Sequence, residues 1–321
     1  MSGPVALNVA VLDDYQHVAH SLADWASLQP QANTVFFHDH VGEADALAAR
    51  LEPFDAVVLM RERTRFDANL LARLPRLKLI VSVGMWNAAI DLDAAKSRGI
   101  VVSGTTGGDA AATPALTWSL ILAVTRNLYG ETASLRAGGW QTRMGTDVNG
   151  KTLGVLGLGR IGEAVARIGV AFGMRVIAWS QNLTSERASE VGVQRVEKDE
   201  LFREVDVLTI HLKLGDRTKG LVGARELGLM KPGAYLVNTS RGPIVSEDAL
   251  IEALQERRIG GAALDVFDEE PLPAGHPFRF LPNVLATPHI GYVTENTYRV
   301  AYPQIVEAIR AWIDGSPVRQ L

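Results

Sequence analysis

Short apolar runs alternate along the chain with longer stretches in which apolar residues recur at helical spacing. Most of the runs are rich in β-branched residues and carry no charge, whereas segments such as 43–51 and 68–74 have the 3.6-residue period of a helix. Uninterrupted apolar strands that alternate with helices are typical of a parallel sheet covered on both faces. In the first hundred residues the expected strands are 5–12, 34–37, 56–60, 77–83 and 100–102.

The same alternation starts again in the second half of the chain. Before it, we predict that Thr113 caps a long apolar helix over residues 115–128, with Pro114 at its first position, because these residue types favour those places. Residues 138–150 are polar and glycine-rich, as in a loop. The expected strands are 152–157, 175–179, 205–211, 234–238, 262–266 and 284–286, and helices are expected over 161–172 and 301–313.

Composition narrows the class of protein. The chain has 321 residues, which at about 150 residues per domain predicts two domains. With 32 basic and 36 acidic residues the net charge is −4, too small and too evenly spread to indicate a nucleic-acid partner. Cysteine is absent, which excludes disulfides, thiol nucleophiles and iron–sulfur clusters. His38 and His40 lack an evident third ligand, so we interpret them as a strand end and predict no metal site.

The sequence also bears on location. No apolar run reaches the roughly 18 residues that a membrane span requires. Residues 1–10 have no basic segment ahead of an apolar one, as a secretory signal would have. We therefore expect a cytoplasmic protein without a membrane partner.

Two glycine-rich motifs suggest phosphate binding, but only one has the required context. Residues 145–152 match the P-loop pattern GxxxxGK[ST], which needs a strand before it and a helix after it. Here a strand follows the motif instead. We therefore interpret Lys151 as a solvated residue that leads into that strand.

The second motif, Gly157-Leu-Gly159-Arg160-Ile161-Gly162, follows an expected strand and precedes an expected helix. This is the context of a dinucleotide-binding turn, in which the first glycine makes the turn, the second admits a pyrophosphate and the third lets helix and sheet pack closely. Amides at the helix start, including those of Arg160 and Ile161, would bind the phosphates. We therefore predict that this half of the chain binds a dinucleotide.

The end of the next expected strand leaves the choice between NAD and NADP open. An acidic residue about 20 positions after the motif binds the ribose 2′-hydroxyl of NAD in this fold. The sequence there is Trp179-Ser180-Gln181-Asn182, without an acid, and the first arginine that follows is Arg187. Ser180 can bind a ribose and would not repel a 2′-phosphate. Either cofactor is expected, with a slight preference for NAD.

Three further segments carry a more specific pattern. They are Asn238-Thr239-Ser-Arg241-Gly-Pro-Ile-Val245, Ala263-Leu-Asp265-Val-Phe-Asp-Glu-Glu270-Pro271-Leu272 and Thr287-Pro-His289-Ile-Gly291. With residues 157–162, and over nearly the whole chain, the sequence resembles the D-isomer-specific 2-hydroxyacid dehydrogenases, among them phosphoglycerate dehydrogenases and glyoxylate or hydroxypyruvate reductases. The phosphoglycerate enzymes of this family often carry an extra C-terminal regulatory domain, and because this chain ends at Leu321 we expect none here.

We accordingly predict an α/β protein of two doubly wound, Rossmann-like parallel-sheet domains, with the active site in the cleft between them. Residues 1–103 and 292–321 would form the substrate domain, and residues 104–291 the dinucleotide-binding domain. A homodimer is expected from the resemblance, and the apolar helix 115–128 is the candidate contact.

The resemblance implies a role for each matching residue. Arg241 would polarise the substrate carbonyl and pair with its carboxylate, since a guanidinium binds two oxygens at once. His289 would be the acid/base, and Glu270 would pair with it. Contacts with the cofactor are implied for Thr239, His211, Asp265 and Gly291, although Lys213 stands where a proline is usual after His211.

The substrate contacts are expected in the first hundred residues. Gly84, Met85 and Trp86 lie where the family has a glycine-rich loop whose amides bind the substrate carboxylate, and Trp86 replaces a second glycine. Arg61, in Arg61-Glu-Arg63-Thr64, is either a solvated residue or a second contact to an anionic substrate. In the second case, a distal phosphate or carboxylate on the substrate is favoured.

The implied function is hydride transfer between NAD or NADP and a small D-2-hydroxy acid or the corresponding 2-oxo acid. Two alternatives stay open. A nicotinamide-sensing protein, like the transcriptional corepressors of the family, would need cofactor binding without the set of Arg241, Glu270 and His289. The other alternative is a formate or phosphite dehydrogenase on the same fold.

Overall fold

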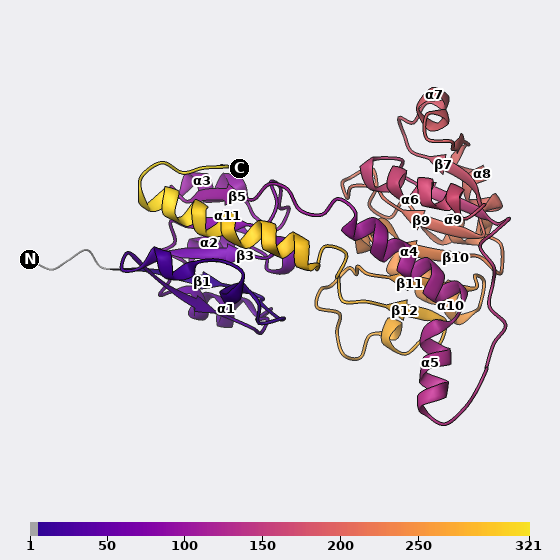
Figure 1. The fold of residues 1–321 in the computed structure, drawn as a ribbon, viewed down its shortest axis with the longest axis horizontal. Helices are drawn as coiled ribbons and strands as arrows, with labels where there is room; N and C mark the ends of the chain where they lie inside the picture. The colour runs from indigo at the N-terminus through magenta and orange to yellow at the C-terminus, as the bar shows by residue number, and fades with distance from the viewer. Residues whose placement is uncertain (1–5) are drawn as a thin grey trace, which may run out of the picture. The chain divides into compact units, whose positions relative to one another are not determined.

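The computed structural model describes residues 6–321, so the first five, which include the start of the first expected strand, lie outside the described residues. The chain divides into two compact units (Figure 1). The first comprises the chain up to Asp109 together with Thr294–Leu321, and the second comprises Ala110–Val293. The second unit is therefore an insertion in the first.

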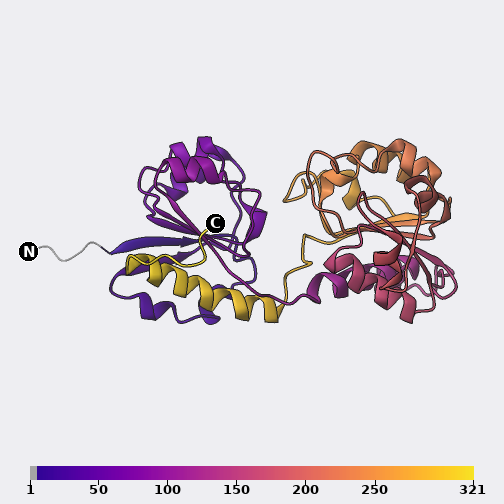
Figure 2. The same cartoon turned by 90° about the horizontal axis from the view of Figure 1, so that it is seen from above.

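The first unit is built on a parallel sheet covered by helices. Its elements are β1 (Leu7–Val11), β2 (Ala32–Phe36), α1 (Ala44–Leu51), β3 (Ala56–Leu59), α2 (Ala68–Ala72), β4 (Leu79–Ser82), α3 (Leu92–Ser97), β5 (Val101–Gly104) and α11 (Glu295–Ile313). In the described residues the strand order is β2-β1-β3-β4-β5, with every pair parallel. Helices α1, α2 and α3 bury apolar side chains such as Leu51 and Phe66 on one face. Helix α11 packs on β4 and β5 from the other face (Figure 2).

The second unit repeats this plan with a wider sheet. Its strands are β6 (Thr152–Leu156), β7 (Arg175–Trp179), β8 (Gln194–Arg195), β9 (Val207–Ile210), β10 (Tyr235–Asn238), β11 (Gly261–Leu264) and β12 (Val284–Ala286). Its helices are α4 (Ala112–Thr125), α5 (Leu128–Arg136), α6 (Arg160–Ala171), α7 (Ser185–Ser189), α8 (Lys198–Glu204), α9 (Ala224–Leu229) and α10 (Glu247–Gln255). Within the described part, the order is β12-β11-β10-β9-β6-β7-β8. Helices α4 and α6 bury Trp118 and Val165 on one face, and α8, α9 and α10 bury Phe202 and Leu250 on the other.

The predicted α/β class with two Rossmann-like parallel sheets is confirmed. Each expected strand has a counterpart, and the added strand β8 has only two residues, too few to show a periodic pattern. Lys151 is exposed and leads directly into β6. This agrees with the interpretation that residues 145–152, which are followed by a strand and not by a helix, are not a P-loop. Helix α11 begins earlier than residue 301, because Thr294 caps it by accepting a hydrogen bond from the Thr297 N–H. No helix in residues 6–321 is long and apolar enough to cross a membrane.

The prediction for the long apolar helix was wrong at both ends. The helix starts after Ala111, and no side chain caps it. Thr113 lies inside the first turn, and its hydroxyl donates to Gly291 O at 3.1 Å instead. The helix stops at Thr125 because Asn127, with a φ of 50°, adopts the left-handed conformation and starts α5. The expected single helix is therefore two helices.

Candidate functional site

The predicted residues of the second unit lie where its strands end. All strands of its described sheet run parallel, so their carboxyl ends share one edge, and the strand order reverses direction between β6 and β9. Ligands of open α/β sheets bind outside the carboxyl ends at such a reversal. The residues that follow these strand ends are Gly157 after β6, His211 after β9, Arg241 after β10, Asp265 after β11 and His289 after β12.

The turn after β6 fits a pyrophosphate. Gly157 has a φ of +105°, and a Cβ there would lie 2.7 Å from His211 O, so only glycine makes this turn. A Cβ on Gly162 would lie 2.0 Å from Gly157 O. Gly159 differs, because a Cβ there would have no heavy atom within 4 Å, and no side chain caps the start of α6. The open space at Gly159, beside the positive end of the helix, suits the phosphates of a dinucleotide.

The ribose position follows β7. Ser180 is half-buried there, and Gln181 and Asn182 are exposed. Arg187, the first arginine beyond them, is held by two carboxylates. Its guanidinium pairs with Glu163 in the first turn of α6 and with Glu190 at 2.9 Å. Arg187 is thus already paired with two carboxylates of the protein.

His289 and Glu270 form a direct pair. His289 Nδ1 lies 2.6 Å from Glu270 Oε2, and Glu270 Oε1 accepts from Phe267 N–H at 2.9 Å. His289 has a left-handed φ of 51°, and its ring meets the edge of Tyr292 with 5.5 Å between centroids. Because Nδ1 faces the carboxylate, Nε2 is the ring nitrogen available for proton exchange with a ligand.

Asp265 anchors the loop that carries His289. It is fully buried, and its carboxylate accepts from Thr287 Oγ1 at 2.6 Å, Ile290 N–H at 2.8 Å and Gly291 N–H at 2.8 Å. Burial raises the pKa of Asp265, and these hydrogen bonds oppose the rise. The structure therefore gives Asp265 a role in holding the loop, in addition to the cofactor contact that the sequence implied.

Arg241 follows β10 in a tightly packed turn. Its Nη1 donates to Ser240 O at 2.7 Å. A Cβ on Gly242 would lie 2.1 Å from the carbonyl carbon of Phe267, so the turn touches the segment that leads to Glu270. Packing thus brings the Arg241 turn and the Glu270 segment together.

In the first unit, the predicted substrate residues gather at the ends of β3 and β4. Arg61 has a left-handed φ of 54°, and its Nη1 lies 3.4 Å from where a Cβ on Gly84 would stand. Gly84 N–H donates to Thr105 Oγ1 at 2.9 Å, so this amide is already bonded. Met85 and Trp86 follow with 41% and 57% of their surface exposed. Arg61 and this loop therefore form one surface.

Two buried asparagines that the sequence analysis did not single out support these turns. Asn238 Nδ2 donates to Arg241 O at 2.9 Å, and its Oδ1 accepts from Ser240 N–H at 3.0 Å. Asn87 Nδ2 donates to Arg61 O at 2.7 Å and to Ser82 Oγ at 2.9 Å. The available signal was an amide side chain at or just beyond an apolar strand, where the polar group must find a backbone partner.

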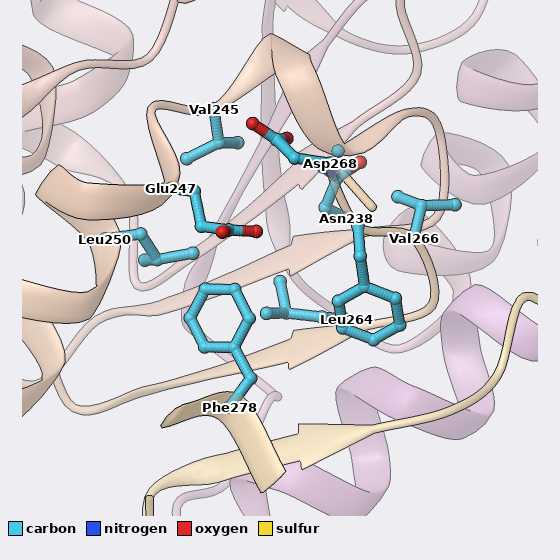
Figure 3. Close-up of a pocket in the computed structure, with 10 residues that line it drawn as sticks. Asn238, Val245, Glu247, Leu250, Leu264, Val266, Asp268 and Phe278 are labelled. Atoms are coloured by element: carbon cyan, nitrogen blue, oxygen red, sulfur yellow. The ribbon is translucent and has the colours of Figure 1, made fainter. Parts of the chain in front are cut away.

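A small cavity lies behind the Arg241 turn. The carboxylate of Glu247 projects into it (Figure 3). Glu247 Oε1 lies 3.0 Å from His276 Nε2. Desolvation, followed by the neighbouring charge of Glu247, raises the pKa of Asp268 at its rim. None of the three predicted catalytic side chains lines this cavity, so we assign it to packing. Its apolar lining comprises Val245, Leu250, Leu264, Val266, Phe267 and Phe278.

The two histidines near β2 have partners within the fold. His38 Nδ1 lies 3.0 Å from Asp14 O, and His40 Nδ1 lies 2.9 Å from Asp13 Oδ1. In residues 6–321, no three or more His, Cys, Asp or Glu side chains are grouped to hold a metal ion.

Comparison with known proteins identifies the family. Residues 118–291 match the model of the D-isomer specific 2-hydroxyacid dehydrogenase NAD-binding domain. The chain belongs to this family. A glyoxylate reductase of Aeropyrum pernix is 44% identical over 243 residues, which cover 73% of this chain and 72% of that protein.

Other D-2-hydroxyacid dehydrogenases extend the match. A D-3-phosphoglycerate dehydrogenase of Methanocaldococcus jannaschii is 38% identical over 81% of this chain, which spans about 50% of that longer protein. The solved structure of a phosphoglycerate oxidoreductase from Vibrio cholerae superposes with a TM-score of 0.91 at 39% identity, covering 96% of this chain and 99% of that one. As a D-2-hydroxyacid dehydrogenase, the protein is an oxidoreductase that transfers hydride between a nicotinamide cofactor and a 2-hydroxy acid or 2-oxo acid.

Proposed function

We propose that the protein reduces a small 2-oxo acid, with Arg241, Glu270 and His289 as its catalytic residues. The second unit would bind the cofactor, and the first unit would supply the substrate loop. The observation that carries this proposal is the 2.6 Å contact between His289 and Glu270 at the strand edge that also holds the phosphate turn. A protein that only senses nicotinamide would not need this pair.

The chemistry assigns a separate task to each group. The bound cofactor supplies the hydride. During reduction, negative charge develops on the carbonyl oxygen, and the Arg241 guanidinium stabilises it. His289 donates the proton from Nε2, and Glu270 holds the ring in the required orientation through Nδ1. Gly159 and the amides of Arg160 and Ile161 would bind the cofactor phosphates.

We propose NAD as the preferred cofactor. Ser180 leaves the ribose position uncharged, which alone would permit NADP. Recognition of a 2′-phosphate requires a cation, and the neighbouring Arg187 is paired with Glu163 and Glu190. The two carboxylates thus favour a cofactor without the extra phosphate.

For the substrate, we propose an unphosphorylated 2-oxo acid of the size of glyoxylate or hydroxypyruvate. Arg61 lies against the loop of Gly84 and can pair with one carboxylate. Arg63 is engaged elsewhere, because its Nη1 donates to Asp13 O at 2.6 Å and its guanidinium lies 4.7 Å from the centre of the Tyr15 ring. We therefore propose Arg61, whose Nε also lies 3.8 Å from Glu62 Oε2, as the partner of the substrate carboxylate, and Trp86 on the adjacent loop as a residue that sets the size of the acid.

We further propose a homodimer formed through α4, α5 and the segment after α5. In that segment Trp140 is 74% exposed and Met144 is 99% exposed, and Leu128 and Leu135 are exposed on α5. The segment is nevertheless held in place, since Glu131 accepts from Thr142 N–H at 3.0 Å. An ordered segment that presents large apolar side chains indicates a protein partner, and a second copy of the chain is the partner we propose.

The test is a spectrophotometric screen with NADH and NADPH against glyoxylate, hydroxypyruvate and phosphohydroxypyruvate. We expect turnover with NADH and the two unphosphorylated acids. Cofactor binding without turnover of any 2-oxo acid would contradict the proposal and favour a sensing protein. Activity confined to formate or phosphite with NAD⁺ would favour the other alternative.

A further inference from the structure

Helix α4 touches two of the site segments through hydroxyl groups. Thr113, in its first turn, donates to Gly291 O at 3.1 Å. Thr117, one turn later, has its Oγ1 2.8 Å from Thr239 Oγ1. Thr117 also makes the bond that is common for a hydroxyl in a helix, to the carbonyl four residues before it, so its contact with Thr239 is an additional one. On the same helix, Thr125 makes such a bond with Ile121 O at 2.8 Å.

The Thr113 contact gives the loop that carries His289 a second point of attachment. The Gly291 N–H donates to Asp265 Oδ2 at 2.8 Å, and its carbonyl accepts from Thr113. The amide and the carbonyl of Gly291 are therefore both held in place, the first by Asp265 just after β11 and the second by Thr113 on α4. His289 lies two residues earlier in a left-handed conformation, which persists only where its surroundings enforce it.

The Thr117 contact fixes the segment that leads to Arg241. Thr117 Oγ1 donates to Thr113 O at 2.9 Å, and a hydroxyl has a single hydrogen. Thr239 must then be the donor to Thr117, which sets the orientation of its hydroxyl. Thr117 and Thr239 are both buried, so water does not replace the bond. Thr239 lies between the end of β10 and Arg241.

We propose that Thr113 and Thr117 are positioning residues for the reaction. From one helix they hold the segments of His289 and Arg241 in a fixed relation. The inference rests on the proposed catalytic roles of those two side chains. It explains why the hydroxyl at position 113 does not cap its helix: it is bonded to the loop of the acid/base instead.

The experiment compares Thr113→Val and Thr117→Val, which remove a hydroxyl at similar volume, with Thr113→Ser and Thr117→Ser, which keep it. In the full-length protein, we expect each valine variant to lower kcat roughly tenfold while KM changes less than about threefold, because small displacements of reacting groups reduce turnover strongly. Amide hydrogen exchange should rise about tenfold at Gly291 in Thr113→Val and at Ser240 in Thr117→Val. The serine variants should restore both readouts.

Thr125→Val is the matched control, since Thr125 is buried on the same helix but bonds only within it. It should change the thermal midpoint without changing kcat or exchange at the two amides. The inference would be overturned if Thr113→Val and Thr117→Val showed the same kcat, and the same exchange at the two amides, as Thr125→Val. If the wild type turns over no 2-oxo acid, the proposed function fails, and the exchange measurement still decides whether α4 holds these loops.

Discussion

His289 Nδ1 and Glu270 Oε2 lie 2.6 Å apart, although 19 positions separate the two residues in the chain. Parallel pairing of β11 with β12 brings the segments that carry them to one edge of the sheet. The Glu270 carboxylate is held in turn by the backbone N–H of Phe267 at 2.9 Å. The Glu270 carboxylate thus orients the His289 ring, and the backbone in turn orients the carboxylate, an arrangement that suits general acid/base catalysis.

The first prediction concerns this pair. His289→Gln should lower kcat by about 10²–10⁴, the usual contribution of a general acid, and leave cofactor affinity within about threefold. Glu270→Gln should cost less, because an amide can still bond to the ring. Steady-state kinetics and a cofactor fluorescence titration measure the two quantities. Glu269→Gln, an exposed neighbour, is the control. Equal losses of turnover and cofactor affinity in His289→Gln would contradict the assigned role.

The second prediction separates two glycines of one motif. Gly159→Ala should keep the thermal midpoint and weaken NADH binding about tenfold or more, because its Cβ would enter the open space beside the helix start. Gly162→Ala should lower the thermal midpoint, since its Cβ would lie 2.0 Å from Gly157 O. Calorimetry and a binding titration on both variants provide the comparison. A destabilised Gly159→Ala with normal affinity would show that the space is not a phosphate site.

The fold was predictable because most of its strands are buried on both faces. Such strands appear in the sequence as plain apolar runs. Residues 175–179 matched β7 at both ends, and residues 284–286 matched the partly exposed β12. The glycine motif was informative for a related reason: at Gly157 and Gly162 the backbone approach excludes any side chain. For the buried strands and for the glycine turn alike, the local space restricts which residue types can occupy the position.

The contacts between distant segments could not be predicted in the same way. Thr113 has the residue type and position of a helix cap, and only the tertiary structure shows that its hydroxyl reaches Gly291. The break after Thr125 was missed because Asn127 is an ordinary polar residue that happens to adopt a left-handed conformation. The supports from Asn87 and Asn238 likewise depend on which backbone turns come near them. Side chains that bond to remote backbone carry no periodic signal.

The third prediction tests cofactor preference. Ser180→Asp places a carboxylate where the family fold binds the ribose hydroxyl. It should lower kcat/KM with NADPH at least about tenfold while activity with NADH stays or rises, because a carboxylate repels a 2′-phosphate. Ser185→Asp, an exposed residue at the start of α7, adds the same charge nearby and is the control. Equal effects of Ser180→Asp on both cofactors would place the ribose elsewhere.

The fourth prediction concerns the proposed dimer. Replacing Trp140 and Met144 together by serine removes the two most exposed large apolar side chains of the described residues. Sedimentation should show a shift from dimer to monomer or a dissociation constant raised at least about a hundredfold, as expected for central apolar contacts. Phe280→Ser, at another exposed apolar residue, is the control. A wild type that is monomeric at micromolar concentration would refute the proposed contact directly.

The fifth prediction follows from His211, whose backbone touches the Gly157 turn. Desolvation lowers the pKa of His211 from 6.5 to about 3, so the folded protein keeps this ring neutral where the unfolded chain binds a proton. The contribution of His211 to the free energy of unfolding is therefore complete above about pH 6.5. It is lost as the pH falls toward 3, because protons then bind to the unfolded chain and not to the folded one. In that range His211 should contribute a slope of about 1.4 kcal/mol per pH unit to the free energy of unfolding.

Urea unfolding of the wild type and His211→Asn at pH 7, 6 and 5 measures this slope, and the variant should lack it. Thr209→Val removes the partner of Nε2 at 2.9 Å but leaves the ring desolvated, so it should keep the slope. In NMR, the ring signal of His211 should stay at its neutral position down to pH 5. A titration midpoint near 6.5 would mean that water reaches the ring, and hence that the turn beside Gly157 is more open than the structure shows.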